Sequence, residues 1–312
     1  MKKLLALLLS LMMVFAANAA LADALTFTTG GTAGTYYGYG NVLAQYVKAN
    51  SEVDMTAVAG NGSADNIDKL DMQVAQLGFV QNDVAYYAYN GIRIYEGDPV
   101  TSFTAIAALY TETVQLITCN PDIKSVADLK GKNVSIGSQG SGVYFNAIDV
   151  LEAYGLTEKD ITPSYKSFGD SVDALQSGKI DAAFVVAGAP TSAVSGLAAT
   201  TDVYLIGLDD EHIDKLIAAS PHYTKEVISS KTYNTAGDIN TVAVGAVLIA
   251  NADVSEDDVY NVISGIYENA DAITKAHSKG AELNIEAAAA ITSAPYHSGA
   301  AKYFGEKGIT VK

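Results

Sequence analysis

The chain has 312 residues, of which 49% are hydrophobic and 17% charged, and its formal net charge at pH 7 is −16. This acidic balance makes nucleic acid a poor partner, because phosphate binding relies on lysine and arginine. The single cysteine, Cys119, excludes an intramolecular disulfide, and the four histidines show no metal-ligand spacing. We therefore expect no metal site, no cofactor and no nucleic acid partner.

The first residues have the pattern of a secretory signal peptide. Met1-Lys2-Lys3 precedes an apolar run, Leu4–Ala17, and small residues end the segment at Ala22. The run is short for a membrane span, and no cysteine follows it to carry a lipid. A retained membrane helix is the alternative. We expect residues 1–22 to be removed and the mature protein to lie in the periplasm as a monomer, not lipid-anchored.

Apolar segments rich in β-branched residues alternate with segments of helical period along the rest of the chain. Strands are expected at residues 25–29, 53–59, 77–80, 103–109, 114–119, 134–137, 180–186, 203–208 and 242–250. Helices are expected at residues 36–49, 64–72, 83–89, 143–154, 171–176, 191–198, 256–275 and 285–291. This alternation predicts an α/β fold with largely parallel sheets.

A lobe boundary is plausible near the turn-like residues 110–113. If the chain also crosses back near residue 228, the first lobe consists of residues 23–112 and 229–312. The second lobe is then residues 113–228.

Three glycine-rich turns each follow an expected strand and begin an expected helix: Thr26–Gly34, Val58–Ser63 and Val134–Gly142. Such turns gather at the carboxyl ends of strands, where helix starts offer unpaired amides to an anion. One helix end contributes only about 0.3–1 kcal/mol to an exposed anion, so several must converge. Arg93, the only arginine, is expected in a surface loop. An anion would therefore be held by amides, hydroxyls or a lysine.

The first turn combines glycines for close backbone approach with hydroxyl groups. It matches neither a dinucleotide fingerprint nor a phosphate loop. Alternatively, Thr35 only caps its helix and the glycines only form a turn. The candidate ligand-binding residues here are Gly31, Thr32, Gly34, Thr35 and Tyr36.

The later turns supply the remaining candidates. In the alternative interpretation Ser63 only caps its helix, and Asp83 is expected to be a helix cap. Ser138 and Ser141 lack the spacing of a nucleophile elbow and a histidine base, so a hydrolase is not favoured. The candidate ligand-binding residues are Asn61, Ser63, Gln81, Ser138, Ser141, Gly142 and Val143, with Gly188 and Pro190 on the opposite wall.

Taken in order, these segments resemble the solute-binding proteins of TRAP transporters of the TAXI type. The resemblance covers nearly the whole mature chain. It is carried by Gly30–Tyr37, Asn61–Asn66, Val80–Ala85, Ser125–Val134, Gly140–Gly142, Ile180–Phe184, Gly188–Pro190 and Pro295–Tyr303.

The resemblance implies a two-lobed periplasmic binding protein, type II-like, with a hinge and an interlobe ligand cleft. It implies a non-catalytic protein that hands a small anionic ligand to TRAP transporter membrane subunits. Family members are associated with glutamate, glutamine and dicarboxylates such as 2-oxoglutarate. Other TRAP binding proteins clamp a carboxylate with arginine, for which this sequence has no candidate. A sensing protein that signals to a membrane receptor and a secreted serine hydrolase are the alternatives.

Overall fold

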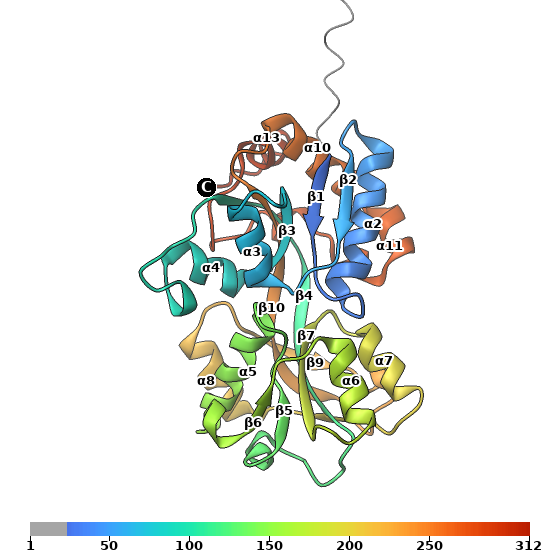
Figure 1. Ribbon diagram of the computed structural model, residues 1–312. Coiled ribbons are helices and arrows are strands. Elements are labelled where there is room, and N and C mark those ends of the chain that lie inside the picture. Colours follow the sequence, from blue (N-terminus) through green and yellow to red (C-terminus); the bar gives the residue numbers. More distant parts are fainter. Residues whose placement is uncertain (1–23) are drawn as a thin grey trace, which may run out of the picture.

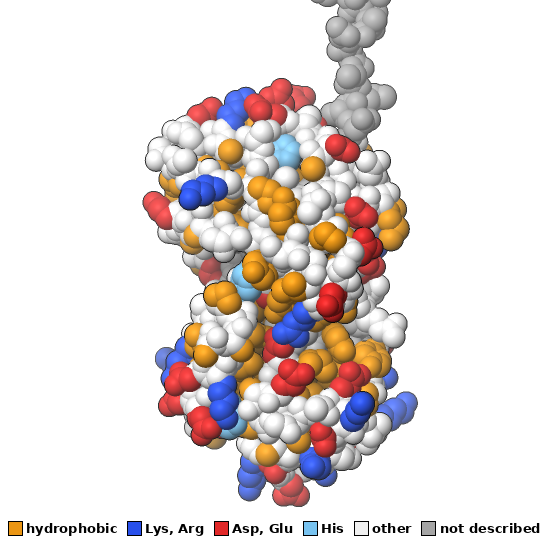
Figure 2. All heavy atoms as spheres, turned by 90° about the vertical axis from the view of Figure 1, so that its left-hand side faces the viewer, with side chains coloured by type: hydrophobic (Ala, Val, Ile, Leu, Met, Phe, Trp, Pro, Cys, Tyr) orange, Lys and Arg blue, Asp and Glu red, His pale blue; other side chains and the backbone are white. Residues whose placement is uncertain are grey.

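The computed structural model describes residues 24–312, so the expected signal peptide lies outside the described residues. Two lobes lie one above the other in Figure 1, and two long strands, β4 (Phe103–Thr118) and β10 (Ile239–Asn251), run through both. The surface narrows between the lobes in Figure 2. The strand order is β2-β1-β3-β10-β4-β7-β5-β6, with β8 beside β4 and β9 beside β10.

The first lobe is the upper one in Figure 1. Its own strands are β1 (Leu25–Thr28), β2 (Met55–Val58) and β3 (Leu77–Gln81). Its helices are α2 (Thr35–Asn50), α3 (Ser63–Asp71), α4 (Asn82–Asn90), α10 (Glu256–Tyr267), α11 (Ala270–Ala276), α12 (Ile285–Ala288) and α13 (Ser298–Glu306), with the 3-10 helices η1 (Arg93–Tyr95) and η4 (Ser278–Glu282).

The second lobe contains the middle of the chain. Its strands are β5 (Asn133–Ser135), β6 (Thr162–Ser164), β7 (Ala182–Ala187), β8 (Tyr204–Ile206) and β9 (Thr224–Ile228). Its helices are α5 (Gly142–Ala153), α6 (Phe168–Gln176), α7 (Ser192–Ala198), α8 (Asp210–Ala219) and α9 (Ser230–Tyr233), with η2 (Val126–Leu129) and η3 (Glu158–Asp160).

The predicted α/β alternation is confirmed, but the prediction of largely parallel sheets is wrong. Five of the nine strand pairings in the described residues are antiparallel. All five involve β4 or β10, which run against their neighbours because each passes through both lobes. The strands expected at residues 103–109 and 114–119 are one strand, and residues 110–113 continue it as a ladder with β10.

Other differences arise where local pattern is weak. The helix expected at residues 256–275 is two helices, because Asn269 leaves helical geometry between α10 and α11. Two strands were not predicted, β6 and β9, whose side chains are mostly exposed or half-buried. β6 also contains Pro163, which is tolerated at a sheet edge. Helices α8, α9 and α13 were not predicted either.

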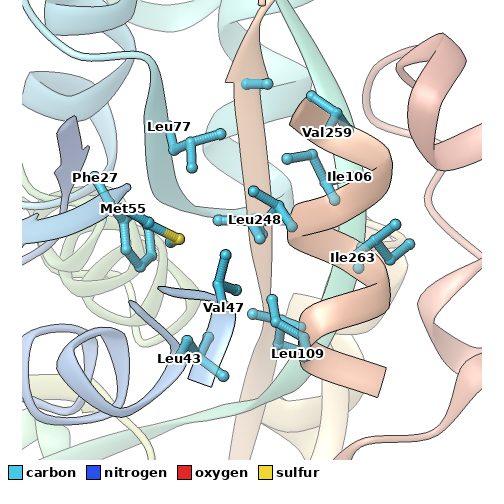
Figure 3. Packing of buried hydrophobic residues seen from close by; sticks show 14 of the residues in the cluster. Phe27, Leu43, Val47, Met55, Leu77, Ile106, Leu109, Leu248, Val259 and Ile263 are labelled. Atoms are coloured by element: carbon cyan, nitrogen blue, oxygen red, sulfur yellow. The ribbon is translucent and has the colours of Figure 1, made fainter. Parts of the chain in front are cut away.

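Each lobe has a hydrophobic core of its own. In the first lobe, side chains from β1, α2, β3, β4, β10 and α10 pack together, as Figure 3 shows for Phe27, Leu43, Leu248 and Ile263. The cores divide within β4 between Tyr110 and Val114 and within β10 between Val244 and Ala246. The predicted first crossing, at 112/113, falls in the first interval. The cores favour a second crossing inside β10 rather than at 228/229.

Candidate functional site

A cavity of about 100 Å³ lies where the two lobes meet. That is room for several waters, and so for a small organic solute. Eleven of the fourteen candidate residues line it: Gly31, Gly34, Thr35, Tyr36, Asn61, Ser63, Gln81, Ser138, Ser141, Gly142 and Val143. The tertiary structure thus brings the three glycine-rich turns to one place, and contact of these residues with a ligand stays a prediction.

Three candidate residues do not line this cavity. Thr32 is exposed, and the wall assigned to Gly188 and Pro190 is formed by the preceding strand residues Val186 and Ala187. The carbonyl of Gly188 instead accepts a hydrogen bond from Thr35 Oγ1 at 3.2 Å, which joins the lobes.

Gly30, Gly60 and Gly62, which belong to the predicted turns, also line the cavity. Six further lining residues were not predicted from the sequence: Tyr110, Glu112, Ser167, Phe168, Val186 and Ala187. Tyr110 and Glu112 were missed because their segment was interpreted as a turn between strands. A usable signal was present, since an ionisable residue flanked by long apolar runs on both sides is unusual for an exposed turn.

Two helix starts face the cavity from opposite lobes. Helix α2 begins at Thr35 in the first lobe and α5 begins at Gly142 in the second, and neither has a side-chain cap. Thr35 Oγ1 donates to Gly188, and Ser141 Oγ donates to the carbonyl of Ser138 at 2.7 Å. The interpretation of Thr35 as a cap is therefore wrong. The first-turn amides and positive dipole ends of both helices are available to an anion.

The third helix start, that of α3, is engaged by the protein itself. The amides of Ala64 and Asp65 both donate to the carbonyl of Gly140 in the other lobe, at 3.0 Å each. Ser63 Oγ accepts from the amide of Gln81 at 3.0 Å, so the interpretation of Ser63 as a cap is also wrong. This helix start holds the lobes together.

The first-lobe side of the cavity ends in a group of buried polar side chains, Tyr36, Gln81, Tyr110 and Glu112, which we call the polar floor. The Tyr36 ring stacks on Phe79 with centroids 4.7 Å apart, and Tyr110 meets the same ring edge-on at 6.3 Å. Four atoms of the floor lack a partner with hydrogen-bond geometry in the described chain, namely the two tyrosine hydroxyls, Gln81 Oε1 and Glu112 Oε1, although Tyr36 and Gln81 lie close enough to Glu112 to lower the pKa of its carboxyl. Buried polar groups in proteins are normally hydrogen-bonded, so these atoms are candidates for contact with a polar group of a ligand.

Burial dominates the ionisation of Glu112, which is only 2% exposed. The pKa of its carboxyl is raised to about 8: desolvation is the largest cause and nearby Asp83 also raises the pKa, whereas Tyr36, Gln81 and Lys279 lower it. Lys279 is itself paired with Glu282. No lysine or arginine of the described residues lies within salt-bridge distance of Glu112.

Close approach at the α5 start depends on glycine. A Cβ atom on Gly142 would lie 1.6 Å from Gln81 Oε1 and 2.9 Å from Ser63 Oγ, both in the other lobe. Only a residue without a side chain fits there when the lobes are in this arrangement.

A series of hydrogen bonds between buried side chains runs from Gln81 across the lobe interface. Gln81 Nε2 donates to Asn146 Oδ1 at 3.0 Å, and Asn146 Nδ2 donates to Asp83 at 2.9 Å. Burial raises the pKa of Asp83 to about 7. Asp83 accepts from its neighbour's amide and from Asn146 but does not occupy the cap position of α4, which corrects the prediction that it caps that helix.

The outer end of the interface is closed by an ion pair. Arg93 Nη2 donates to Asp149 Oδ1 at 2.6 Å, and the hydroxyl of Tyr223 donates to Asp149 Oδ2 at 2.8 Å. Arg93 does lie in a surface segment, as expected, but its guanidinium links the first lobe to the second. The structure is therefore a closed arrangement of the lobes.

The lining residues offer hydrogen bonding and charge rather than an evident reaction. None of the histidines in the described chain lines the cavity, so neither Ser138 nor Ser141 has an imidazole base beside it. Within residues 24–312 no cluster of three or more potential metal ligands occurs. No helix in the same range is both long and apolar enough to cross a membrane.

Comparison with known proteins adds a family and a fold. The sequence profile of the NMT1-like family matches residues 27–308. The alkanesulfonate-binding protein SsuA from Xanthomonas axonopodis pv. citri, bound to MOPS, has a TM-score of 0.51 at 16% identity over 85% of this chain and 82% of its own.

Two further solved structures are similar. PhnD1 from Prochlorococcus marinus (MIT 9301), in complex with methylphosphonate, has a TM-score of 0.51 at 12% identity over 78% of this chain and 84% of its own. The GluR0 ligand-binding core in complex with L-glutamate has a TM-score of 0.50 at 12% identity over 84% of this chain and 99% of its own. These likenesses show the fold, the two-lobed type II fold of periplasmic binding proteins, and confirm the predicted fold class.

Proposed function

This chain belongs to the NMT1-like family, and from that premise we propose that it is an extracytoplasmic solute-binding protein for a small anionic solute. Glutamate, glutamine or a related dicarboxylate such as 2-oxoglutarate is the solute we favour. The observation that carries the proposal is the cavity between the lobes, where two uncapped helix starts face each other. A carboxylate there would accept from amides of both lobes at once.

Solved structures of the same fold support an anionic ligand. An alkanesulfonate-binding protein, a methylphosphonate complex and an L-glutamate complex are among them. Each name describes an acid small enough for an interlobe cavity. The absence of an arginine beside the cavity, within residues 24–312, agrees with recognition by amides and hydroxyls.

The mechanism we propose is closure on the ligand. A solute that contacts both lobes binds the closed arrangement more tightly than an open one, and so shifts the population toward closure. Part of the closed state is formed by protein contacts alone, such as those from α3 to Gly140. The ligand would supply the rest by joining the α2 and α5 starts.

We further propose that the protein is exported to the periplasm and hands its ligand to TRAP transporter membrane subunits. The signal-peptide pattern of residues 1–22 and the resemblance to TAXI-type binding proteins support this. Proteoliposomes holding TRAP membrane subunits from the same organism should take up the solute only with the protein present. Uptake that is independent of the protein would contradict delivery.

A thermal-shift screen of the protein without residues 1–22 tests ligand capture. We expect glutamate, glutamine or a dicarboxylate to raise the melting temperature by several degrees, because a ligand at one hundred times Kd stabilises by about 2.7 kcal/mol. Sulfonates, phosphonates, sugars and cations serve as comparison ligands. If only sugars or cations shift the melting curve, an anionic solute is the wrong class.

A further inference from the structure

The polar floor lies in the same cavity as the starts of α2 and α5. The helix starts offer hydrogen-bond donors to an anion, whereas the floor presents acceptors, including the carboxyl of Glu112. We propose that the polar floor is a subsite for a protonated amine, so that the ligand is a zwitterionic amino acid rather than a dicarboxylate or an oxo acid. This inference rests on the proposed capture of a small carboxylate at the α2 and α5 starts. Glu112 is then the specificity-determining residue.

The hydrogen-bonding groups of the polar floor favour an amine as the ligand group. Gln81 is 1% exposed, and because its Nε2 already donates to Asn146, the acceptor Oε1, which lies against Gly142, is left without a donor. Glu112 Oε1 is a second unpartnered acceptor, and the two tyrosine hydroxyls can donate or accept. An ammonium group brings three donors and can satisfy both acceptors at once.

A second carboxylate group of the ligand would be unfavourable at the polar floor. A carboxylate has no donor, so Gln81 Oε1 would stay buried and unpaired, which is costly. It would also face Glu112, and two carboxylates in one buried site cannot both ionise. A dicarboxylate could bind with Glu112 protonated, which is its state at pH 7 in the ligand-free protein, but Gln81 Oε1 would still lack a donor. An ammonium instead pairs with the ionised carboxyl.

The charged groups around the polar floor also favour a cationic ligand group. Glu112 acts on its neighbours from close by, since after burial it is the next cause that raises the pKa of both Tyr36 and Tyr110. The one lysine that acts on Glu112, Lys279, is paired with Glu282. The carboxyl therefore has no salt-bridge partner in the described chain, and the ligand can provide one.

Isothermal titration calorimetry of the protein at pH 7 tests the subsite. L-Glutamate, 2-oxoglutarate and glutarate share a five-carbon skeleton, and only glutamate carries an amine. We expect glutamate to bind at least about 100-fold more tightly than either analogue, because a site built to pair with an N–H group rejects ligands that lack it. We also expect binding of glutamate to release close to one proton, detected by titration in buffers of different ionisation enthalpy.

The variant Glu112→Gln separates recognition from folding. Its affinity for glutamate should fall about 10-fold or more, its affinity for 2-oxoglutarate should change much less, and the proton release should disappear. Glu52→Gln, an exposed substitution of the same kind, should leave all three quantities unchanged. A purely structural role of Glu112 would weaken every ligand alike.

The outcomes distinguish the two proposals. If glutarate or 2-oxoglutarate binds the wild-type protein as tightly as glutamate, or if Glu112→Gln binds glutamate as tightly as the wild type, the amine subsite is wrong while capture of an anion stands. If none of the acids binds, the proposed function itself fails.

Discussion

The carboxyl of Glu112 makes the stability of the ligand-free protein depend on pH. Burial raises its pKa from the ordinary 4.5 to about 8, so the folded state holds a proton that the unfolded chain releases at lower pH. The stabilising effect of that proton is complete below about pH 4.5 and is lost as pH rises through about 8. Asp83, with a pKa raised to about 7, acts in the same direction.

We therefore predict that Glu112→Gln gains stability relative to the wild type as pH rises from 5 to 8.5, since glutamine cannot ionise. Urea denaturation of the ligand-free proteins at several pH values measures the difference. Asp83→Asn should remove the part of the dependence that lies between about pH 4 and pH 7. A wild-type-minus-variant difference that stays constant with pH would mean that the Glu112 carboxyl is hydrated in the free protein.

At the scale of elements, the start of α5 shows how one glycine couples a helix to closure. The clash of an added Cβ at Gly142 would be with Gln81 and Ser63 of the other lobe, not with its own lobe. An alanine there is compatible with the second lobe itself, because Gly142 has no positive φ angle and alanine favours helix. The cost falls on the closed arrangement alone.

Gly142→Ala should thus keep or slightly raise the melting temperature while it weakens ligand binding by about 10-fold or more, a loss of about 1.4 kcal/mol. Calorimetry for stability and titration for affinity measure the two effects. Gly196→Ala in α7, where an added Cβ meets open space, is the matched control and should bind normally. Wild-type affinity in Gly142→Ala would show that the α5 start does not approach Gln81 in the bound state.

For the whole molecule, the contacts between the lobes are polar links together with a few aromatic contacts, such as Phe145 of α5 against Tyr87 of α4. The ion pair of Arg93 with Asp149 and the contacts of Asn146 are among these links. Because the main hydrophobic cluster of each lobe lies within that lobe, such links should change the population of the closed state more than the stability of either lobe. Apparent affinity follows that population.

Asp149→Asn is predicted to increase the radius of gyration of the ligand-free protein, measured by small-angle X-ray scattering, and to lower ligand affinity several-fold. Saturating ligand should restore the compact value, because the ligand still favours closure. Asp54→Asn, which removes the exposed pair with Lys48 inside the first lobe, should change neither quantity. An unchanged radius in Asp149→Asn would argue against the ion pair as a closing contact.

Local pattern determined the order of strands and helices and the three glycine-rich turns, because apolar periodicity and turn residues act over a few neighbouring positions. Thr35, Ser141 and Gly142 could be selected as site candidates for that reason. The contacts of those residues depend on the tertiary structure. For example, the hydroxyl of Thr35 donates to the carbonyl of Gly188, which is 153 positions away. No rule of capping contains that information.

The tertiary structure alone decided strand direction, the lobe that each segment joins, and the polar floor. Residues 110–113 look like a turn in isolation but continue β4, because β10 supplies their hydrogen-bond partners. That pairing carries Glu112 into the cavity, where distant residues remove it from water and shift its pKa. Burial depends on contacts between segments far apart in the chain, so the sequence alone could select the turns proposed to hold an anion, and only the fold placed a carboxyl in the same cavity.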